Sequence, residues 1–181
     1  MFLDEQLGNG CVWINLDVEK IKNLEDLSEI YGLDKETIEY ALDRNERAHM
    51  DYNRENGTVT FIYNVLDLEK DKEYYEAIPM TFIVEKQRMI TISNHKNAYV
   101  IDQMLAYLDN HESLSIYKFL FASLEIISNA YYPIIEKMDK SKDEVNSLLR
   151  QRTTKKNLFA LSDLETGMVN LTAAAKQNRI I

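Results

Sequence analysis

The chain has 181 residues, of which 45% are hydrophobic and 28% are charged, and its formal net charge at pH 7 is −9. This composition excludes a wholly disordered chain, and no apolar run approaches the roughly 20 residues that a helix needs to cross a bilayer. The length predicts one domain of ordinary size, or a compact domain with a helical extension. The N-terminus has neither a basic region nor an apolar run, so we expect no signal peptide and a cytosolic chain.

The charge is distributed unevenly along the chain. Residues 1–113 hold 23 Asp and Glu against 11 Lys and Arg, whereas residues 114–181 hold 7 against 10. An acidic first part argues against nucleic-acid binding, because phosphate groups attract a basic surface. The same negative field would concentrate cations, although many soluble proteins are acidic for solubility alone.

Strands dominate the prediction for the first part. Alternating apolar residues and turn signals predict strands over residues 11–16, 50–54, 58–66, 77–85 and 89–93. Asn56-Gly57, between the second and third of these, is the strongest short signal for a hairpin. Pro79 cannot donate to a ladder, so it belongs near the start of a strand or at an edge.

Short helices are expected between and after these strands. One follows Asn23, which has the residue type of an N-cap, and ends at Gly32, while a second follows Asp34. A third is expected over residues 98–108 from its apolar stripe. The charged run over residues 67–73 predicts a solvated loop.

From Leu114 onward, apolar residues recur at spacings of three and four. This pattern predicts one helix of about 38 residues, about 57 Å long, with a kink at Pro133. A second helix follows residues 150–154, and the short connection predicts an antiparallel hairpin. Two helices leave their apolar stripe partly uncovered, so we expect a third helix or another copy of the chain to complete it. The predicted fold class is α+β, with an acidic sandwich head (1–113) on a mixed or antiparallel sheet, followed by a long helical hairpin (114–181).

The sequence lacks the familiar catalytic constellations. His49, His95 and His111 lie in unrelated segments, without the i, i+4 pair that is typical of zinc sites. Cys11 is the single cysteine, so it can form no internal disulfide or thiolate cluster. Glycine-rich phosphate-binding motifs and the serine-hydrolase elbow are also missing from the sequence. We therefore expect no enzyme activity and no required cofactor.

Six short segments, spread over residues 12–140, resemble a known family when they are taken in order. They are Trp13-Ile14-Asn15-Leu16, then Tyr31-Gly32-Leu33 with Ile38-Glu39-Tyr40-Ala41-Leu42, Arg47-Ala48-His49-Met50-Asp51-Tyr52, residues 61–66, residues 82–85 with 89–92, and residues 131–139. Together they resemble the cytoplasmic part of the CorA-type magnesium channels. The resemblance implies an α/β sandwich head on long helices, assembled as a pentamer of identical chains around a pore.

The resemblance also implies what this chain would do. A third helix, two membrane spans and a Gly-Met-Asn filter would lie beyond Ile181, so the chain would not conduct ions by itself. The implied role is regulatory, on the cytoplasmic side of the cell membrane. In such channels Mg²⁺, held by carboxylates between neighbouring heads, keeps the pore shut, and a hard cation can bridge acidic surfaces in this way.

The candidate metal ligands lie mainly on the second short helix. In the family, the sensing acid directly follows the glutamate that corresponds to Glu39, and here that position is Tyr40. Glu36 and Asp43 lie one helical turn away and could add oxygens, and Glu125 on the long helix is a further candidate. The simpler alternative is that these carboxylates form a solvated helix face. Because half of the implied ligands are missing, we expect weak Mg²⁺ affinity for this chain alone.

The sequence is compatible with two main function classes and, much less well supported, a third. The first is the regulatory domain of a CorA-like transporter for Mg²⁺ or another divalent cation. The second is a soluble adaptor that binds partner proteins through its hairpin, and the third is a metal-dependent enzyme. Two apolar segments of about 20 residues beyond Ile181 would favour the transporter. Neither the ion nor the direction of transport follows from the sequence.

Overall fold

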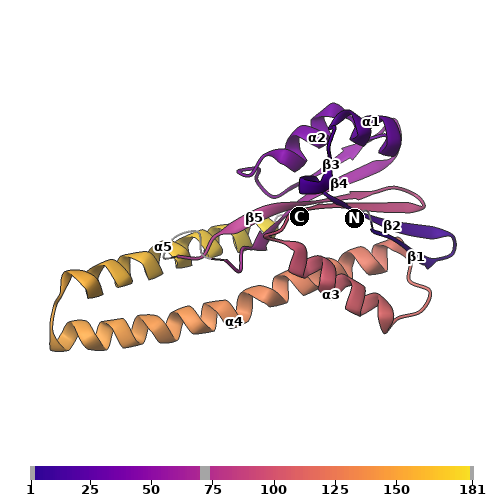
Figure 1. Cartoon of the computed structure of the whole chain (residues 1–181). Helices are drawn as coiled ribbons and strands as arrows, with labels where there is room; N and C mark the ends of the chain where they lie inside the picture. Colours follow the sequence, from indigo (N-terminus) through magenta and orange to yellow (C-terminus); the bar gives the residue numbers. More distant parts are fainter. Residues whose placement is uncertain (1–2, 70–73, 180–181) are drawn as a thin grey trace.

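A six-stranded mixed sheet lies at the centre of the fold (Figure 1). The structure is a computed structural model and describes residues 3–69 and 74–179. The strands are β1 (Leu3–Gly8), β2 (Cys11–Asp17), β3 (His49–Asn53), β4 (Thr58–Leu66), β5 (Ala77–Val84) and β6 (Arg88–Ser93). Their order is β1-β2-β6-β5-β4-β3, in which β2 and β6 pair in parallel and the other neighbours pair antiparallel.

Helices cover both faces of this sheet. Those of the described residues are α1 (Glu25–Tyr31), α2 (Lys35–Leu42), α3 (Ala98–Asp109), α4 (Ile116–Gln151) and α5 (Lys155–Asn178), with a short 3₁₀ turn at Val18–Lys20. Helices α1 and α2 lie on one face, and α3, α4 and α5 lie on the other (Figure 1). Phe82 and Ile83 are neighbours on β5 and point to opposite faces, so each belongs to a different apolar cluster. This arrangement confirms the α+β prediction.

Local turn and cap signals act largely as predicted. Gly32 ends α1 in the left-handed region with φ 70°, and Gly57 has φ 73° in the turn between β3 and β4. Pro79 lies near the start of β5, where β6 does not yet pair, because the β5–β6 ladder begins at Thr81. A missing N–H therefore costs no ladder hydrogen bond at this position.

The N-terminal strand β1 was not among the predicted strands. Its sequence does not alternate between apolar and polar residues over enough positions to be recognised. It is joined to β2 through Asn9 and Gly10, both with positive φ (53° and 73°), as the centre of a type I′ turn requires. The Asn9-Gly10 dipeptide carries the same hairpin signal as Asn56-Gly57 and could have located this strand.

Asn23 caps the start of α1 as predicted, because its Oδ1 accepts a hydrogen bond from the Glu25 N–H at 3.1 Å, while Leu24 already has helical φ and ψ and forms no side-chain cap. One local prediction was wrong. Asp67, expected in a solvated loop, is buried, with a side chain 1% exposed. It is held there by an ion pair with Lys96 that compensates for the lost hydration. Residues 70–73 of that loop lie outside the described residues.

The predicted antiparallel hairpin is formed by α4 and α5 (Figure 1). The 36 residues of α4 span about 54 Å, and the helix continues through Pro133. Its first part packs on the sheet through Phe119, Ile127, Tyr131 and other buried residues. In the described chain, α4 has no buried residue after Met138, and α5 has none before Gly167. The division of the chain at residue 113 stays a prediction.

The end of α5 provides hydrogen-bond partners for a part of the β4 backbone that does not pair with β3. The β3–β4 ladder reaches only to Ile62, so Asn64 has no β3 partner. The Asn178 side chain takes that place, because its Oδ1 accepts from the Asn64 N–H and its Nδ2 donates to the Asn64 carbonyl, both at 2.8 Å. Tyr131 Oη donates to the same carbonyl at 2.9 Å. These bonds satisfy buried backbone groups that would otherwise be unpaired.

Candidate functional site

Helix α2 presents two of the four predicted ligands, Glu36 and Glu39, on its outer side, and Asp43 follows its last residue. Asp34 caps the helix as predicted, since its Oδ1 accepts a hydrogen bond from the Thr37 N–H at 2.7 Å. Thr37 and Ile38 are the buried residues of α2, so this side of the helix packs toward the sheet. Glu36 and Glu39 are therefore left in contact with solvent.

Tyr40 binds one of the predicted ligands. Its hydroxyl donates to Glu36 Oε1 at 2.6 Å, one helical turn away. This hydrogen bond, followed by desolvation and the negative charges of Glu36, Glu46 and Asp51, raises the pKa of Tyr40 to about 12. The Tyr40 ring also packs edge-on against His49, with 5.0 Å between ring centroids. Tyr40, where the resemblance implies an acidic side chain, is thus a neutral hydrogen-bond donor.

The other two carboxylates of α2 have separate partners. Glu39 Oε1 lies 3.3 Å from Lys35 Nζ, but the two side chains are 66% and 90% exposed, so this ion pair contributes little. Asp43 ends the helix, and its Oδ1 accepts a hydrogen bond from the Asn45 N–H at 2.9 Å. Each carboxylate is thus oriented by its own local contact.

The four predicted ligands do not converge on one point. Glu125 is an exposed residue of α4, which covers the face of the sheet opposite to α2 (Figure 1). Within residues 3–69 and 74–179, no group of three His, Cys, Asp or Glu side chains could hold a metal ion. Because Mg²⁺ prefers about six oxygen ligands, the α2 carboxylates of one chain do not fit a complete site.

A polar groove lies beside the C-terminal end of α2. It consists of two hollows, of about 360 and 370 Å³, that share a lining including Arg44, Asn45 and Glu76. One hollow extends to α5 at Gln177, and the other to the loop before α3 at His95. The groove is lined by charges of both signs, so it favours no single class of ligand.

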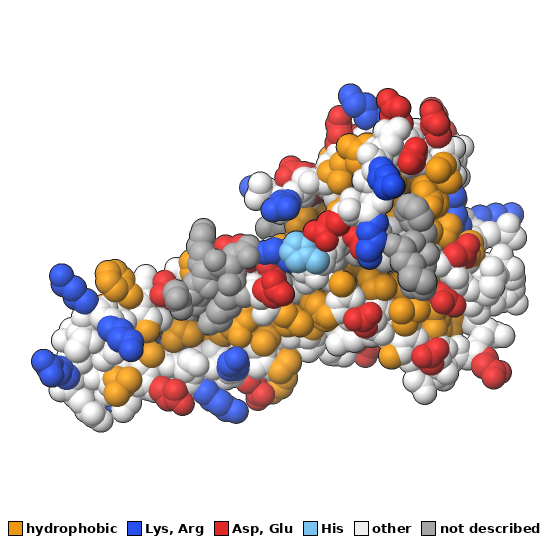
Figure 2. Space-filling model, in the orientation of Figure 1, with side chains coloured by type: hydrophobic (Ala, Val, Ile, Leu, Met, Phe, Trp, Pro, Cys, Tyr) orange, Lys and Arg blue, Asp and Glu red, His pale blue; other side chains and the backbone are white. Residues whose placement is uncertain are grey.

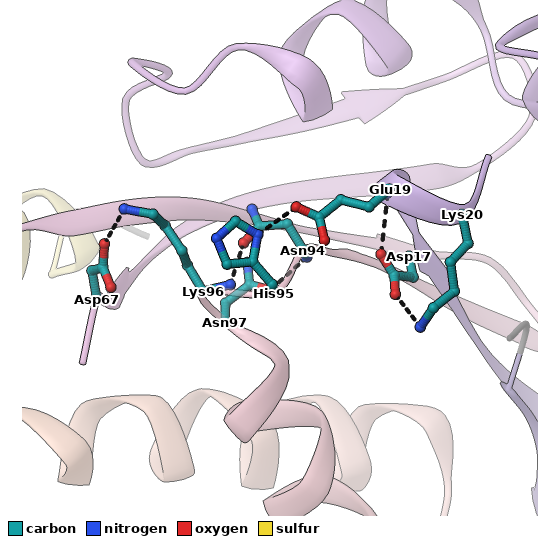
Figure 3. A network of polar contacts seen from close by, with 8 residues as sticks. All are labelled: Asp17, Glu19, Lys20, Asp67, Asn94, His95, Lys96 and Asn97. Carbon is teal, nitrogen blue, oxygen red and sulfur yellow. Dashed lines mark hydrogen bonds and ion pairs between the residues drawn. The ribbon is translucent and has the colours of Figure 1, made fainter. Parts of the chain in front are cut away.

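An ion pair and a histidine–carboxylate hydrogen bond that the sequence analysis missed hold the loops beside this groove (Figure 3). Lys96 Nζ lies 2.7 Å from Asp67 Oδ2, and the Lys96 side chain is only 17% exposed. His95 pairs with Glu19 from the 3₁₀ turn after β2. The partners are far apart in sequence, so no spacing rule connects them. The one sequence feature that could have indicated a buried ion pair was the position of Asp67, directly after the apolar strand β4.

The fold and this surface define a class of protein. It is an α+β domain on a long helical hairpin, and it presents carboxylates without a catalytic constellation in its described part. Residues 8–181 match the model of the CorA-like Mg²⁺ transporter protein family. Because this match covers nearly the whole chain, the chain belongs to that transporter family.

Solved structures share the fold at low sequence identity. The soluble domain of CorA from Methanocaldococcus jannaschii is 16% identical with a TM-score of 0.78, and the match covers 95% of this chain and 68% of that one. The complete CorA magnesium transporter from the same organism is 17% identical with a TM-score of 0.81, over 98% and 56%. The ZntB cytoplasmic domain from Vibrio parahaemolyticus RIMD 2210633 is 12% identical with a TM-score of 0.59, over 97% and 81%.

These matches also define how much of a transporter the chain represents. It spans 56% of the length of the complete CorA transporter that it resembles. A comparison with curated proteins found no match. None of the helices described for residues 3–69 and 74–179 combines the length and the apolar character of a membrane span.

Proposed function

We propose that the chain is the cytoplasmic regulatory part of a divalent-cation transporter, which acts on gating and does not conduct ions by itself. Membership of the CorA-like family over residues 8–181 carries this proposal. The likeness of the fold to the CorA soluble domain and to the ZntB cytoplasmic domain supports the cytoplasmic location. In the whole protein, the head then lies at the inner side of the cell membrane.

The proposal includes a pentamer in which Mg²⁺ acts as a regulatory ion between copies. One chain does not bring its carboxylates together, so an ion at this surface needs oxygens from a second surface. All three α2 carboxylates are exposed, and Glu39 and Asp43 are the best placed to contribute, because Glu39 has only a solvated ion pair and Asp43 accepts from a single backbone N–H. Glu36 is already engaged by the Tyr40 hydroxyl.

Ion flux through the complete transporter tests the regulatory role. We expect flux to fall as internal Mg²⁺ rises, and Glu39→Ala with Asp43→Ala to weaken this inhibition. The control removes two exposed carboxylates elsewhere, Glu29→Ala with Glu112→Ala, and should leave the inhibition unchanged. Flux that does not depend on internal Mg²⁺, or that both double variants alter equally, would contradict the proposal.

A calorimetric titration tests the need for a second surface. The 181-residue chain in dilute solution should bind Mg²⁺ weakly, because its carboxylates each have a separate partner. Micromolar, stoichiometric binding by the monomeric chain would mean that one chain holds a complete site, and it would refute a shared site.

A second candidate function, a protein-binding adaptor, is favoured by one observation. Tyr117, Phe121 and Tyr132 lie on one side of α4 and are 61%, 65% and 67% exposed. An adaptor would use this side to bind a different protein, whereas a transporter would cover it with another part of its own assembly. The double variant Phe121→Ser with Tyr132→Ser distinguishes the transporter from the adaptor. In a transporter it should impair assembly of the complete protein, whereas in an adaptor it should impair binding of the partner protein and leave assembly unchanged.

A further inference from the structure

The far end of the hairpin concentrates positive charge in an otherwise acidic protein. We define the hairpin tip as residues 148–159. It contains four basic residues and no acidic residue, while the whole chain has a net charge of −9. The four basic side chains are exposed, and none has an ion pair in the described part of the chain: Arg150, Arg152, Lys155 and Lys156.

Helix stability does not explain the two lysines of the tip. Lys155 and Lys156 are the first two residues of α5, and no acidic residue accompanies them in that turn. The N-terminus of a helix carries partial positive charge, so acidic residues stabilise it and cations do not. Arg150 differs, because the last turn of α4 favours a cation. The lysines therefore oppose the local preference of the helix, which indicates a role outside folding.

Apolar side chains are interleaved with these charges. Leu148 and Leu158 are 49% exposed, and Phe159 is 68% exposed. Leu158 and Phe159 follow Lys155 by three and four residues, so the three side chains share one side of α5. Figure 2 shows blue and orange side chains at the free end of the hairpin, with red ones nearer to the sheet. Cations beside leucine and an aromatic residue are typical of segments that bind a lipid surface.

The tip is held in a defined shape that projects away from the head (Figure 1). Only three residues join the helices, and both ends are capped. The Arg152 N–H donates to the Leu148 carbonyl at 2.9 Å, and Thr154 Oγ1 accepts from the Asn157 N–H at 3.2 Å. The side chains that could bind a partner are thus presented together from two capped helix ends.

We propose that the hairpin tip binds the surface of an anionic phospholipid bilayer. The four basic side chains contact the phosphate groups, and Phe159 with Leu158 enters the headgroup region. Membership of a transporter family brings the chain close to a bilayer. Charge complementarity selects anionic lipid. The exposed phenyl ring can bury apolar surface in a lipid headgroup region, which a purely ionic partner does not provide.

Vesicle flotation with the purified 181-residue chain tests this proposal. We expect the chain to float with vesicles of equal parts phosphatidylcholine and phosphatidylglycerol, and not with phosphatidylcholine alone. Raising the salt from about 0.1 M to about 1 M should release it, because the ionic contacts are screened. Phe159→Ser should weaken binding without removing its dependence on salt.

A charge-reversal variant separates binding from folding. Lys155→Glu with Lys156→Glu should weaken vesicle binding at least about tenfold, since each basic residue near an anionic surface contributes appreciably. The same change should leave Tm equal or higher, because glutamate suits the first turn of α5. The control, Lys86→Glu with Lys118→Glu, makes the same change in net charge at exposed positions away from the tip, one of them also in a first helical turn, and should retain binding.

Three results would overturn the proposal. The first is equal vesicle binding by the two double variants. The second is full competition by soluble glycerol phosphate, which would indicate a site for small phosphate anions. The third is self-association that needs Lys155 and Lys156 without vesicle binding, which would mean that the tip docks on the acidic head of another copy. None of these results bears on the Mg²⁺-dependent flux, so this inference and the proposed function can fail separately.

Discussion

The hairpin has two halves that share the same pair of helices but are held in different ways. In the half near the sheet, α4 buries Phe119 and Ile127 in the core that it forms with β2, β4 and β5. In the far half, apolar residues recur at the same spacing, but Leu148, Leu158 and Phe159 remain substantially exposed. Helical periodicity therefore indicates where an apolar stripe lies and does not indicate what covers it.

The comparison shows where the stability of the molecule originates. Packing on the sheet supports the near half, while the far half depends on helix–helix contact and on its caps. We therefore expect chemically identical substitutions to have very different effects in the two halves.

A pair of phenylalanines gives the sharpest test. Phe119 is fully buried, with its ring edge-on to Trp13 at a centroid distance of 5.0 Å, whereas Phe159 is 68% exposed. Phe119→Ala should lower the free energy of unfolding by about 3–5 kcal/mol, because it removes a buried ring and leaves a cavity. Phe159→Ala should change it by about 0.5 kcal/mol or less. Urea denaturation followed by circular dichroism measures both, and similar losses would refute the contrast.

Ion pairs should show the same dependence on burial. Lys96→Met leaves the buried Asp67 carboxylate without its partner and should cost about 3 kcal/mol of unfolding free energy. Lys35→Met breaks the exposed pair with Glu39 and should cost about 0.5 kcal/mol or less. Thermal denaturation of the two variants measures the difference. Equal shifts in Tm would show that the Asp67–Lys96 pair is not effectively buried.

A third test concerns the two ends of α5. Asn178→Ala removes both hydrogen bonds to the Asn64 backbone and should cost about 1–2 kcal/mol, because it leaves a buried N–H unpaired. Amide exchange at Asn64 should accelerate. Asn157→Ala, at the exposed start of α5, removes only a 3.5 Å side-chain contact and serves as the control. Unchanged amide exchange at Asn64 in Asn178→Ala would show that the Asn178 side chain does not protect the Asn64 N–H.

The smallest effect is expected on the exposed helix α2. The pKa of Tyr40 is raised to about 12, mainly by its hydrogen bond to Glu36, and Glu36→Gln should bring it back toward the usual value of 10. Between pH 10 and about 12 the unfolded chain releases a proton that the folded chain retains, so stability falls as pH rises through this window. Tyr40 carbon chemical shifts followed by NMR report the titration. A pKa that does not change in Glu36→Gln would show that this hydrogen bond does not control it.

Much of the fold could be predicted from local signals. Asp34 and Gly32 marked helix ends, Asn56-Gly57 marked a hairpin, and the spacing of apolar residues located α3, α4 and α5. The order of the six resembling segments indicated the CorA-like family. The match over residues 8–181 then showed that the chain belongs to it. The candidate ligands Glu36, Glu39, Asp43 and Glu125 remain predictions, since their carboxylates do not meet within the described chain.

Local signals thus indicate the elements other than β1, the class and the family, because caps, turns and periodicity depend on residues that are close together in the chain. Packing in the folded molecule selects three further features: Lys96 neutralises Asp67, Asn178 completes β4 at Asn64, and α4 lies opposite α2. Each of these depends on segments far apart in the sequence, where burial and backbone geometry select the partner. No local pattern encodes that choice, because the free energy of such a contact arises only when the sheet and the hairpin have come together.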